Sequence, residues 1–275
     1  MELYYLPRNI VLYHMLRIKR RKLYDHAEYE RLLEPYLGEY EIMRYCDYFQ
    51  KSEIGDRKIV LIRHDVDHDP ITALKIARWE HDRNIGSTYC LLHTAWYYGH
   101  LDGDRYVHTR DLVDCAKALT DLGHEVNLHN NFVVLALRKG LDAVELLKRE
   151  LDFFRSLGID IKGTSNHGDK LCRELRFRNR ELFTEFCNDR FGGPRTMIWT
   201  GPKCENKVDL GKVSMFNFGL EYECRDVDRD VYHTDSGGRL RTRYRNRRRK
   251  PFGCRDPERG HTVGILTHPI WWKFG

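Results

Sequence analysis

The chain has 275 residues, of which 41% are hydrophobic and 32% are charged. This hydrophobic content can build a core, which excludes an intrinsically disordered chain, and no stretch reaches the roughly 20 apolar residues that a membrane-spanning helix needs. The net charge of +6 is local, because residues 239–250 contain eight Lys and Arg and no acid.

The length suits one large domain. We expect residues 1–25 to form an N-terminal arm and residues 26–275 to fold as a single domain. The eight cysteines form no C-x-x-C pair, which argues against a thiolate zinc site and indicates free thiols in a reducing compartment. We therefore expect a cytoplasmic protein, with contact between the basic residues 17–22 and a membrane surface as an additional option.

Strand and helix patterns alternate along most of the chain. The apolar run at residues 58–65 predicts a buried parallel strand, and Asp69 and Pro70 supply the N-cap and first position of the helix that follows. Further strands are predicted at residues 40–49 (a short strand and turn), 86–93, 124–129, 159–168, 215–226, 230–241 and 261–272. Helices are predicted at residues 26–37, 109–123, 142–158 and 178–189. This alternation predicts βα units around a parallel sheet or barrel.

Polar side chains stand at the carboxyl ends of four of these strands. Asp65 and Asp67 end the first, and His129, His167 and His268 end three others. Because active sites of α/β barrels and open sheets lie at the carboxyl ends of the strands, these side chains should converge on one site.

Asp65 and Asp67 are two residues apart, so they share one face of an extended segment. Neighbouring carboxylates repel one another unless a cation or a proton lies between them. We therefore expect one to bind a metal ion and the other to act as a base. The alternative is a solvated acidic turn before the helix cap.

Each histidine has a catalytic and a structural interpretation. His124 and His129 are five apart and cannot both face the site, and His129, at the strand end, is the better ligand. His167 is either a metal ligand or a turn residue. His268 is either a core residue or a general acid, since an imidazole that titrates near neutrality can protonate a leaving amine.

Three motifs in this order, RHDVD, GHEVNLHNN and LTHPIWW, resemble those of the polysaccharide deacetylases of the NodB-homology type, in particular the deacetylase-like proteins of surface-polysaccharide gene clusters. The resemblance spans residues 26–275. It implies an α/β fold, a distorted (β/α) barrel that is commonly seven-stranded. It also implies removal of N- or O-linked acetyl groups from sugars with one divalent metal ion, zinc foremost, or nickel, cobalt or iron.

The resemblance also implies roles by position. Asp65 corresponds to the catalytic base, Asp67 to the metal-binding acid, His129 to the first metal histidine and His268 to the general acid. Val133 stands where the family has its second metal histidine, and GTSNHG replaces the family's Arg-x-Pro-x-Gly motif. We expect His167 to supply the missing ligand.

Several other residues are predicted to bind substrate. Trp96, followed by two tyrosines, is a candidate platform for stacking on a sugar, although these aromatic residues could instead pack beneath the site. Asn131 and Asp235 could line the site. Arg239 begins an alternating run of arginines that would share one face of a strand and suit an anionic glycan or a diphosphate-linked sugar. A solvated loop and a nucleic-acid contact are the alternatives.

Together these features predict a metal-dependent hydrolase that acts on an acetylated sugar or polysaccharide precursor in surface-glycan biosynthesis. Two alternatives remain open. One is a catalytically inactive carbohydrate-binding relative of the same fold, which the valine at position 133 favours. The other is a nucleic-acid-associated protein, although we expect no nucleic-acid partner, since the sequence contains no known nucleic-acid-binding module.

Overall fold

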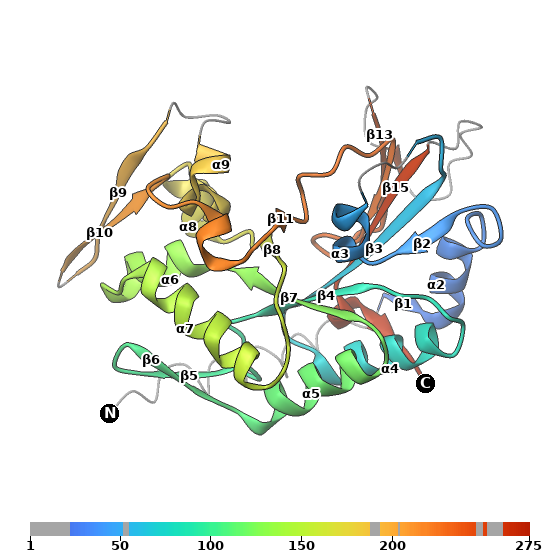
Figure 1. The fold of residues 1–275 in the computed structure, drawn as a ribbon, viewed down its shortest axis with the longest axis horizontal. Helices are drawn as coiled ribbons and strands as arrows, with labels where there is room; N and C mark the ends of the chain where they lie inside the picture. The colour runs from blue at the N-terminus through green and yellow to red at the C-terminus, as the bar shows by residue number, and fades with distance from the viewer. Residues whose placement is uncertain (1–22, 52–54, 188–192, 203, 246–249, 252–260) are drawn as a thin grey trace.

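The computed structural model describes the chain except for residues 1–22, 52–54, 188–192, 203, 246–249 and 252–260. The predicted N-terminal arm therefore lies almost wholly outside the described residues, as does much of the arginine-rich stretch. The described part is a mixed α/β structure built on one curled sheet that forms a half-barrel (Figure 1).

Seven of the eight parallel strands of this sheet form one continuous series. In spatial order they are β11 (Tyr222–Glu223), β8 (Gly163–Asn166), β7 (Glu125–Asn130), β4 (Thr88–Leu92), β3 (Ile59–Val66), β15 (Thr262–Thr267) and β12 (Val231–Thr234). The antiparallel strands β13 (Arg241–Tyr244) and β14 (Lys250–Pro251) extend the sheet beyond β12, and β2 (Glu41–Met43) pairs with the first half of β3. Within the described residues β11 and β12 do not pair, so a closed seven-stranded barrel is not confirmed.

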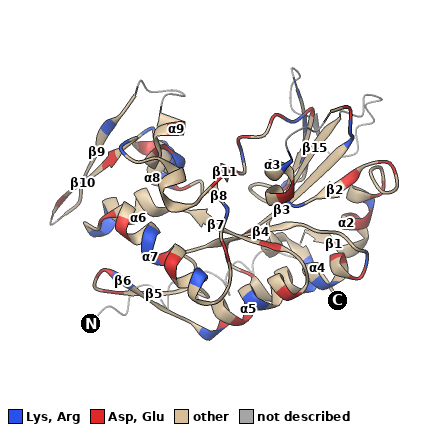
Figure 2. Ribbon diagram, viewed as in Figure 1, with Lys and Arg blue, Asp and Glu red and all other residues tan. Residues whose placement is uncertain are grey.

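Helices follow most of the parallel strands, as the alternating pattern predicts. They are α2 (His26–Leu33), α3 (Tyr45–Gln50), α4 (Pro70–His81), α5 (Arg110–Asp121), α6 (Phe132–Lys139), α7 (Ala143–Ser156), α8 (Lys170–Glu174) and α9 (Thr184–Cys187). The Asp69 side chain accepts a hydrogen bond from the Thr72 amide, which confirms the predicted N-cap of α4. In Figure 2 charged residues mark α4, α5 and α7, whereas the central strands are mostly tan. No helix in the described part of the chain is long and apolar enough to span a membrane.

The two faces of the central strand β3 have different surroundings. Val60 and Ile62 belong to a core cluster that includes residues of α2 and α4; we call this side the outer face. Leu61 points the other way, into a smaller cluster with Cys90 and Tyr222; we call this side the inner face. Because side chains alternate along a strand, Arg63 and Asp65 belong to the inner face and His64 to the outer face.

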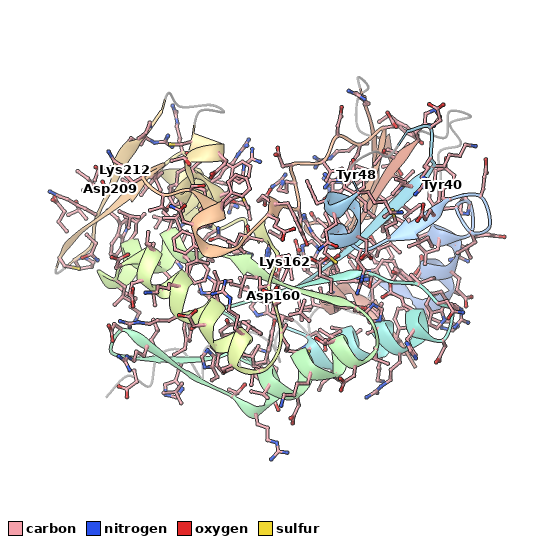
Figure 3. All side chains as sticks on the ribbon, in the orientation of Figure 1. Tyr40, Tyr48, Asp160, Lys162, Asp209 and Lys212 are labelled. Atoms are coloured by element: carbon pink, nitrogen blue, oxygen red, sulfur yellow. The ribbon has the colours of Figure 1, made fainter. Side chains whose placement is uncertain are left out.

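Several shorter elements complete the described structure. These are the hairpins β5–β6 (Gly99–Asp102, Arg105–His108) and β9–β10 (Arg195–Thr200, Glu205–Leu210), the pair β1–β16 (Tyr24–Asp25, Trp272–Lys273), and the 3₁₀ turns η1 (Asn179–Leu182), η2 (Met215–Phe218) and η3 (Pro269–Trp271). Lys162 lies 2.9 Å from Asp160 and 3.2 Å from Glu221, and so ties the start of β8 to the segment before β11 (Figure 3).

Several secondary-structure predictions differ from the structure. Residues 45–50 form helix α3, where a strand and turn were predicted. Residues 215–226 form a 3₁₀ turn and a two-residue strand instead of one long strand, because Gly219 takes a left-handed conformation (φ 77°) that ends extended or helical structure there. Residues 178–189 form η1 and α9 instead of one helix. Helix α6 was not predicted, since Phe132 to Leu137 are all buried and leave no amphipathic period to detect.

Candidate active site

The carboxyl ends of β3, β7, β8 and β15 bring the five predicted residues of the site together. Asp65 lies near the end of β3 and Asp67 just beyond it, His129 lies on β7, His167 directly follows β8, and His268 directly follows β15. The backbone amide of His167 donates to the carbonyl of Asn130 at 2.9 Å, which holds this histidine beside the end of β7.

Asp67, His129 and His167 form a group that could hold a metal ion. Their donor atoms all lie within 4.8 Å of one another. Asp67 Oδ1 is 3.4 Å from His129 Nε2 and 3.7 Å from His167 Nδ1, and the two ring nitrogens are 3.0 Å apart. These are the three residues predicted as ligands, and the position of His167 matches its expected role as replacement ligand. Val133 lies on α6 and is fully buried in the hydrophobic core.

The protonation of these side chains fits a cation site. Asp67 Oδ1 is buried and has no hydrogen-bond partner among the described residues, which is unfavourable for a carboxylate oxygen unless a cation compensates it. Burial raises the pKa of Asp67, but His167 and His129 outweigh this effect and lower the pKa below its usual value. His129 Nδ1 lies 2.9 Å from the carbonyl of Ser165 and must donate to it, so the lone pair of Nε2 faces the site.

His167 also has the protonation state that a ligand needs. Its burial lowers the pKa to about 4 although Asp67 opposes the shift, so the imidazole is neutral at physiological pH. Two imidazole nitrogens and one carboxylate oxygen are a donor set typical of catalytic zinc sites, which leave a further position open. The residues present therefore fit a divalent transition metal.

Asp65 is held ionised beside this group. Arg63 Nη2 donates to Asp65 Oδ2 at 3.2 Å, Arg63 Nε lies 3.0 Å from Oδ1, and both side chains are buried. Burial raises the pKa of Asp65, but Arg63 and the neighbouring histidines lower it well below its usual range. Asp65 Oδ2 is 3.6 Å from His129 Nε2. An ionised carboxylate at this position can accept a proton from a reacting water.

His268 is held protonated on the opposite side of Asp65. Its Nδ1 contacts Asp235 Oδ1 at 2.5 Å, and its backbone amide donates to Asp235 Oδ2 at 2.8 Å. Burial lowers the pKa of His268, but the charge and hydrogen bond of Asp235 outweigh it and raise the pKa to about 9. His268 Nε2 lies 3.9 Å from Asp65 Oδ2, so a protonated nitrogen faces the site.

Two residues predicted to contact substrate are instead committed to other protein groups. Asp235 is fully buried, and Trp272 Nε1 donates to its Oδ2 at 2.7 Å, the oxygen that also accepts from the His268 amide. Asn131 is also buried, and its amide contacts Thr94 and Asn179. Both side chains therefore position their neighbours and offer no free group to a substrate.

The predicted aromatic platform is reduced to one residue. Tyr97 and Tyr98 are fully buried, which corrects their interpretation as stacking residues. Trp96 is half-exposed, and its Nε1 donates to the carbonyl of His68, next to Asp67, at 3.0 Å. Arg239 is exposed just before β13. These two residues remain candidates for contact with a substrate.

Two supporting residues escaped the sequence analysis. Arg63 stands two residues before Asp65 on the same face, and this spacing is the signal that would have found it. Asn179, in η1, is fully buried, and its Nδ2 lies 3.2 Å from the carbonyl of His167 and 3.0 Å from Asn131 Oδ1. Its stretch was predicted as a helix, and nothing in the sequence indicates this role.

His124 has the structural role that its spacing predicts. It is buried on the outer side, where its ring nitrogens contact Ser87 Oγ at 3.0 Å and the carbonyl of Ala77 at 2.9 Å.

Comparison with family models, curated proteins and solved structures finds no match for this chain. The resemblance to polysaccharide deacetylases therefore rests on the motifs alone.

Proposed function

We propose that this protein is a metal-dependent hydrolase that removes an N- or O-linked acetyl group from a sugar or polysaccharide precursor. We further propose that its curled sheet is an open variant of the distorted seven-stranded barrel of polysaccharide deacetylases. The observation that carries the proposal is the buried Asp67 Oδ1, which has no hydrogen-bond partner in the described part of the chain and faces the ring nitrogens of His129 and His167.

Asp67, His129 and His167 would hold the ion, zinc by preference for this donor set. A divalent ion at such a site supplies Lewis acidity, which activates water and polarises the acyl carbonyl.

The protein's own groups supply the proton transfers. Asp65, which Arg63 keeps ionised, accepts a proton from the attacking water as the bond to the carbonyl carbon forms. His268, which Asp235 keeps protonated, donates its proton to the sugar nitrogen or oxygen as the bond to the acyl carbon breaks. The products are acetate and a deacetylated sugar. Two titratable groups with pKa values shifted in opposite directions are typical of a base and an acid in one active site.

The alternative of an inactive sugar-binding relative explains the valine at position 133 but not the rest of the site. In a protein that only binds sugars, a buried carboxylate oxygen without a partner would be destabilising and would serve no purpose. An ionised carboxylate and a protonated imidazole close to one another would serve no purpose there either.

Metal content separates the two alternatives. We expect about one equivalent of zinc or another divalent transition metal in the wild type after metal loading, and none in His129→Gln. His124→Gln is the matched control, because it removes a second buried histidine at the start of the same strand but outside the site. An acetate-release screen on acetylated sugars with wild type and Asp65→Asn follows. A wild type that stays free of metal after loading, or a His129→Gln variant that retains it, would refute the proposal.

A further inference from the structure

The arginines of β13 lie on the same face of the sheet as the candidate active site. Leu240 and Tyr244 pack against the outer core cluster, and Thr242, which is buried, contacts His233 Nδ1 at 2.9 Å. Because side chains alternate along a strand, Arg241 and Arg243 must point to the inner face.

The strand register leads to the same conclusion. Arg241 pairs with Thr234 on β12, Thr234 pairs with Leu266 on β15, and Leu266 pairs with Arg63 on β3. Side chains of paired residues stand on one face, and Arg63 holds the catalytic carboxylate Asp65. Three strand spacings of about 4.8 Å place the backbone of Arg241 roughly 14 Å from that of Arg63. His268 lies two residues beyond Leu266, so it is nearer still to the arginine strand.

The turn between β12 and β13 begins at Asp235, the partner of the candidate acid. The backbone carbonyl of Asp235 accepts hydrogen bonds from the amides of Gly238 at 2.8 Å and Arg239 at 3.2 Å. Gly237 and Gly238 both have left-handed conformations, which let the chain reverse within this short turn. Asp235 therefore positions both the imidazole of His268 and the turn that leads to β13.

The arginines differ in whether their charge is already neutralised. Arg245 forms ion pairs with Asp228 and Asp230. The side chains of Arg239 and Arg241 have no ion-pair or hydrogen-bond partner among the described residues. Arg239 is exposed and Arg241 is half-exposed, so both guanidinium groups can reach a ligand.

We propose that Arg239 and Arg241 form an oxyanion-binding subsite that takes a phosphate or carboxylate group of the sugar substrate. Arg241 lies on the same face as the hydrolytic centre, on the order of 10–15 Å from it, and Arg239 lies in the segment just before β13. The inference rests on the proposed deacetylase function and narrows its substrate class to sugars that carry a negative charge one or two units away from the acetyl group. Guanidinium groups bind such oxyanions in bidentate fashion.

Binding measurements test the subsite. Titration calorimetry would compare uridine diphosphate, a glucuronate-containing disaccharide and neutral N-acetylglucosamine oligomers on metal-loaded protein. We expect Arg239→Gln/Arg241→Gln to weaken binding of at least one anionic probe tenfold or more, and to leave binding of the neutral probe within twofold. Loss confined to uridine diphosphate identifies a phosphate, and loss confined to the disaccharide identifies a carboxylate.

Arg110→Gln/Lys117→Gln is the matched control, because it removes two positive charges from exposed residues of α5. Equal weakening in both double variants, equal weakening of neutral and anionic probes, or no weakening at all would overturn the subsite. The proposal would also be overturned if the two arginines affected the binding of a single-stranded oligonucleotide and of none of the other probes. Metal content and acetate release of the wild type report on the proposed function separately, so the subsite can fail while the hydrolase stands.

Discussion

Two carboxylates on opposite faces of the sheet have contrasting surroundings. Glu80 of α4 lies on the outer face, where it accepts hydrogen bonds from four side chains at 2.5 to 3.1 Å: Tyr29, Tyr89, Ser87 and His64. Asp67 lies at the inner face, and its buried Oδ1 accepts no hydrogen bond from any residue that the structure describes. The protein itself satisfies the hydrogen-bonding capacity of Glu80. Asp67 Oδ1 instead needs a bound cation or another ligand as its partner.

This contrast separates a structural polar cluster from a functional one more sharply than residue type does. Both clusters contain histidines and acids, and they draw on adjacent residues of the same strands. His64 serves the outer cluster and Asp65 the inner one, and on β15 Thr267 contacts His64 Nδ1 at 2.6 Å while His268 faces Asp65. Adjacent residues serve different clusters because the pleat sends them to opposite faces.

The largest effect is expected at Asp67. Asp67→Asn keeps the shape but removes the charge that holds a cation, so we expect loss of bound metal and a fall in acetate release of about a thousandfold or more, roughly 4 kcal/mol. The metal-free variant should lie close to metal-free wild type in stability, because the substitution removes both the repulsion by Asp65 and the opposing attraction to His167 and His129. Elemental analysis, kinetics and urea unfolding measure the three quantities. A marked loss of stability would mean that Asp67 is structural after all.

The reverse pattern is expected at Glu80. Glu80→Ala leaves several buried donors without a partner, so we expect the free energy of unfolding to fall by about 3–5 kcal/mol, while the folded fraction keeps its metal. Urea unfolding and elemental analysis measure these effects. Loss of metal with unchanged stability would mean that Glu80 supports the metal site and does not stabilise the fold.

The pH dependence of this stability has a definite sign. Burial raises the pKa of Glu80, but His64 and the other donors outweigh it and lower the pKa to about 2. The unfolded value is about 4.3, so this contribution is present above about pH 4.3 and is lost as the pH falls toward 2. Acid unfolding of wild type and Glu80→Ala should therefore converge at low pH.

The sequence was sufficient to find the five central residues, for a physical reason. Parallel strands end at one edge of a sheet, so polar residues at four strand ends had to meet there, and the spacing of His124 and His129 showed which of them could do so. The tertiary partners could not be found this way. The partnership of Asp235 with His268 depends on β12 lying next to β15, and the role of Asn179 depends on the path of an irregular segment. Whether the sheet closes depends on the distance between β11 and β12, which no local pattern encodes.

A smaller effect, visible in a pH profile, is expected at Asp235. Asp235→Asn removes the charge that raises the pKa of His268 to about 9. For a general acid, activity declines as the pH rises through this value, so the decline should move to lower pH by one unit or more. At pH 8 a shift of one unit gives a loss of roughly twofold, and a shift of two units gives a loss of roughly tenfold. The profile of acetate release against pH measures the shift.

Thr267→Val provides the matched control for this measurement. It alters the residue next to His268 but removes only the hydrogen bond to His64 on the outer face. If the alkaline decline in activity moved equally in both variants, that decline would not reflect the interaction between Asp235 and His268.

The most indirect effect is expected at Asn179, which acts on the metal group through the backbone of His167. Its Nδ2 donates toward the carbonyl of His167, and its Oδ1 accepts from the amide of Val134 at 3.2 Å. Asn179→Ala should weaken metal binding by about 10–100-fold, as loss of groups that orient metal ligands commonly does. Competition with a chelator measures the affinity.

Asn179→Asp distinguishes positioning from simple packing. It keeps the shape and the acceptor for Val134 but loses the donor to His167, so it should weaken metal binding about as much as alanine does. An aspartate variant with wild-type affinity would show that the space filled by residue 179 matters and the hydrogen bond does not. His167 would then be held by the hydrogen bond from its backbone amide to the carbonyl of Asn130 and by its position after β8. The other ligands are likewise held by their positions at strand ends.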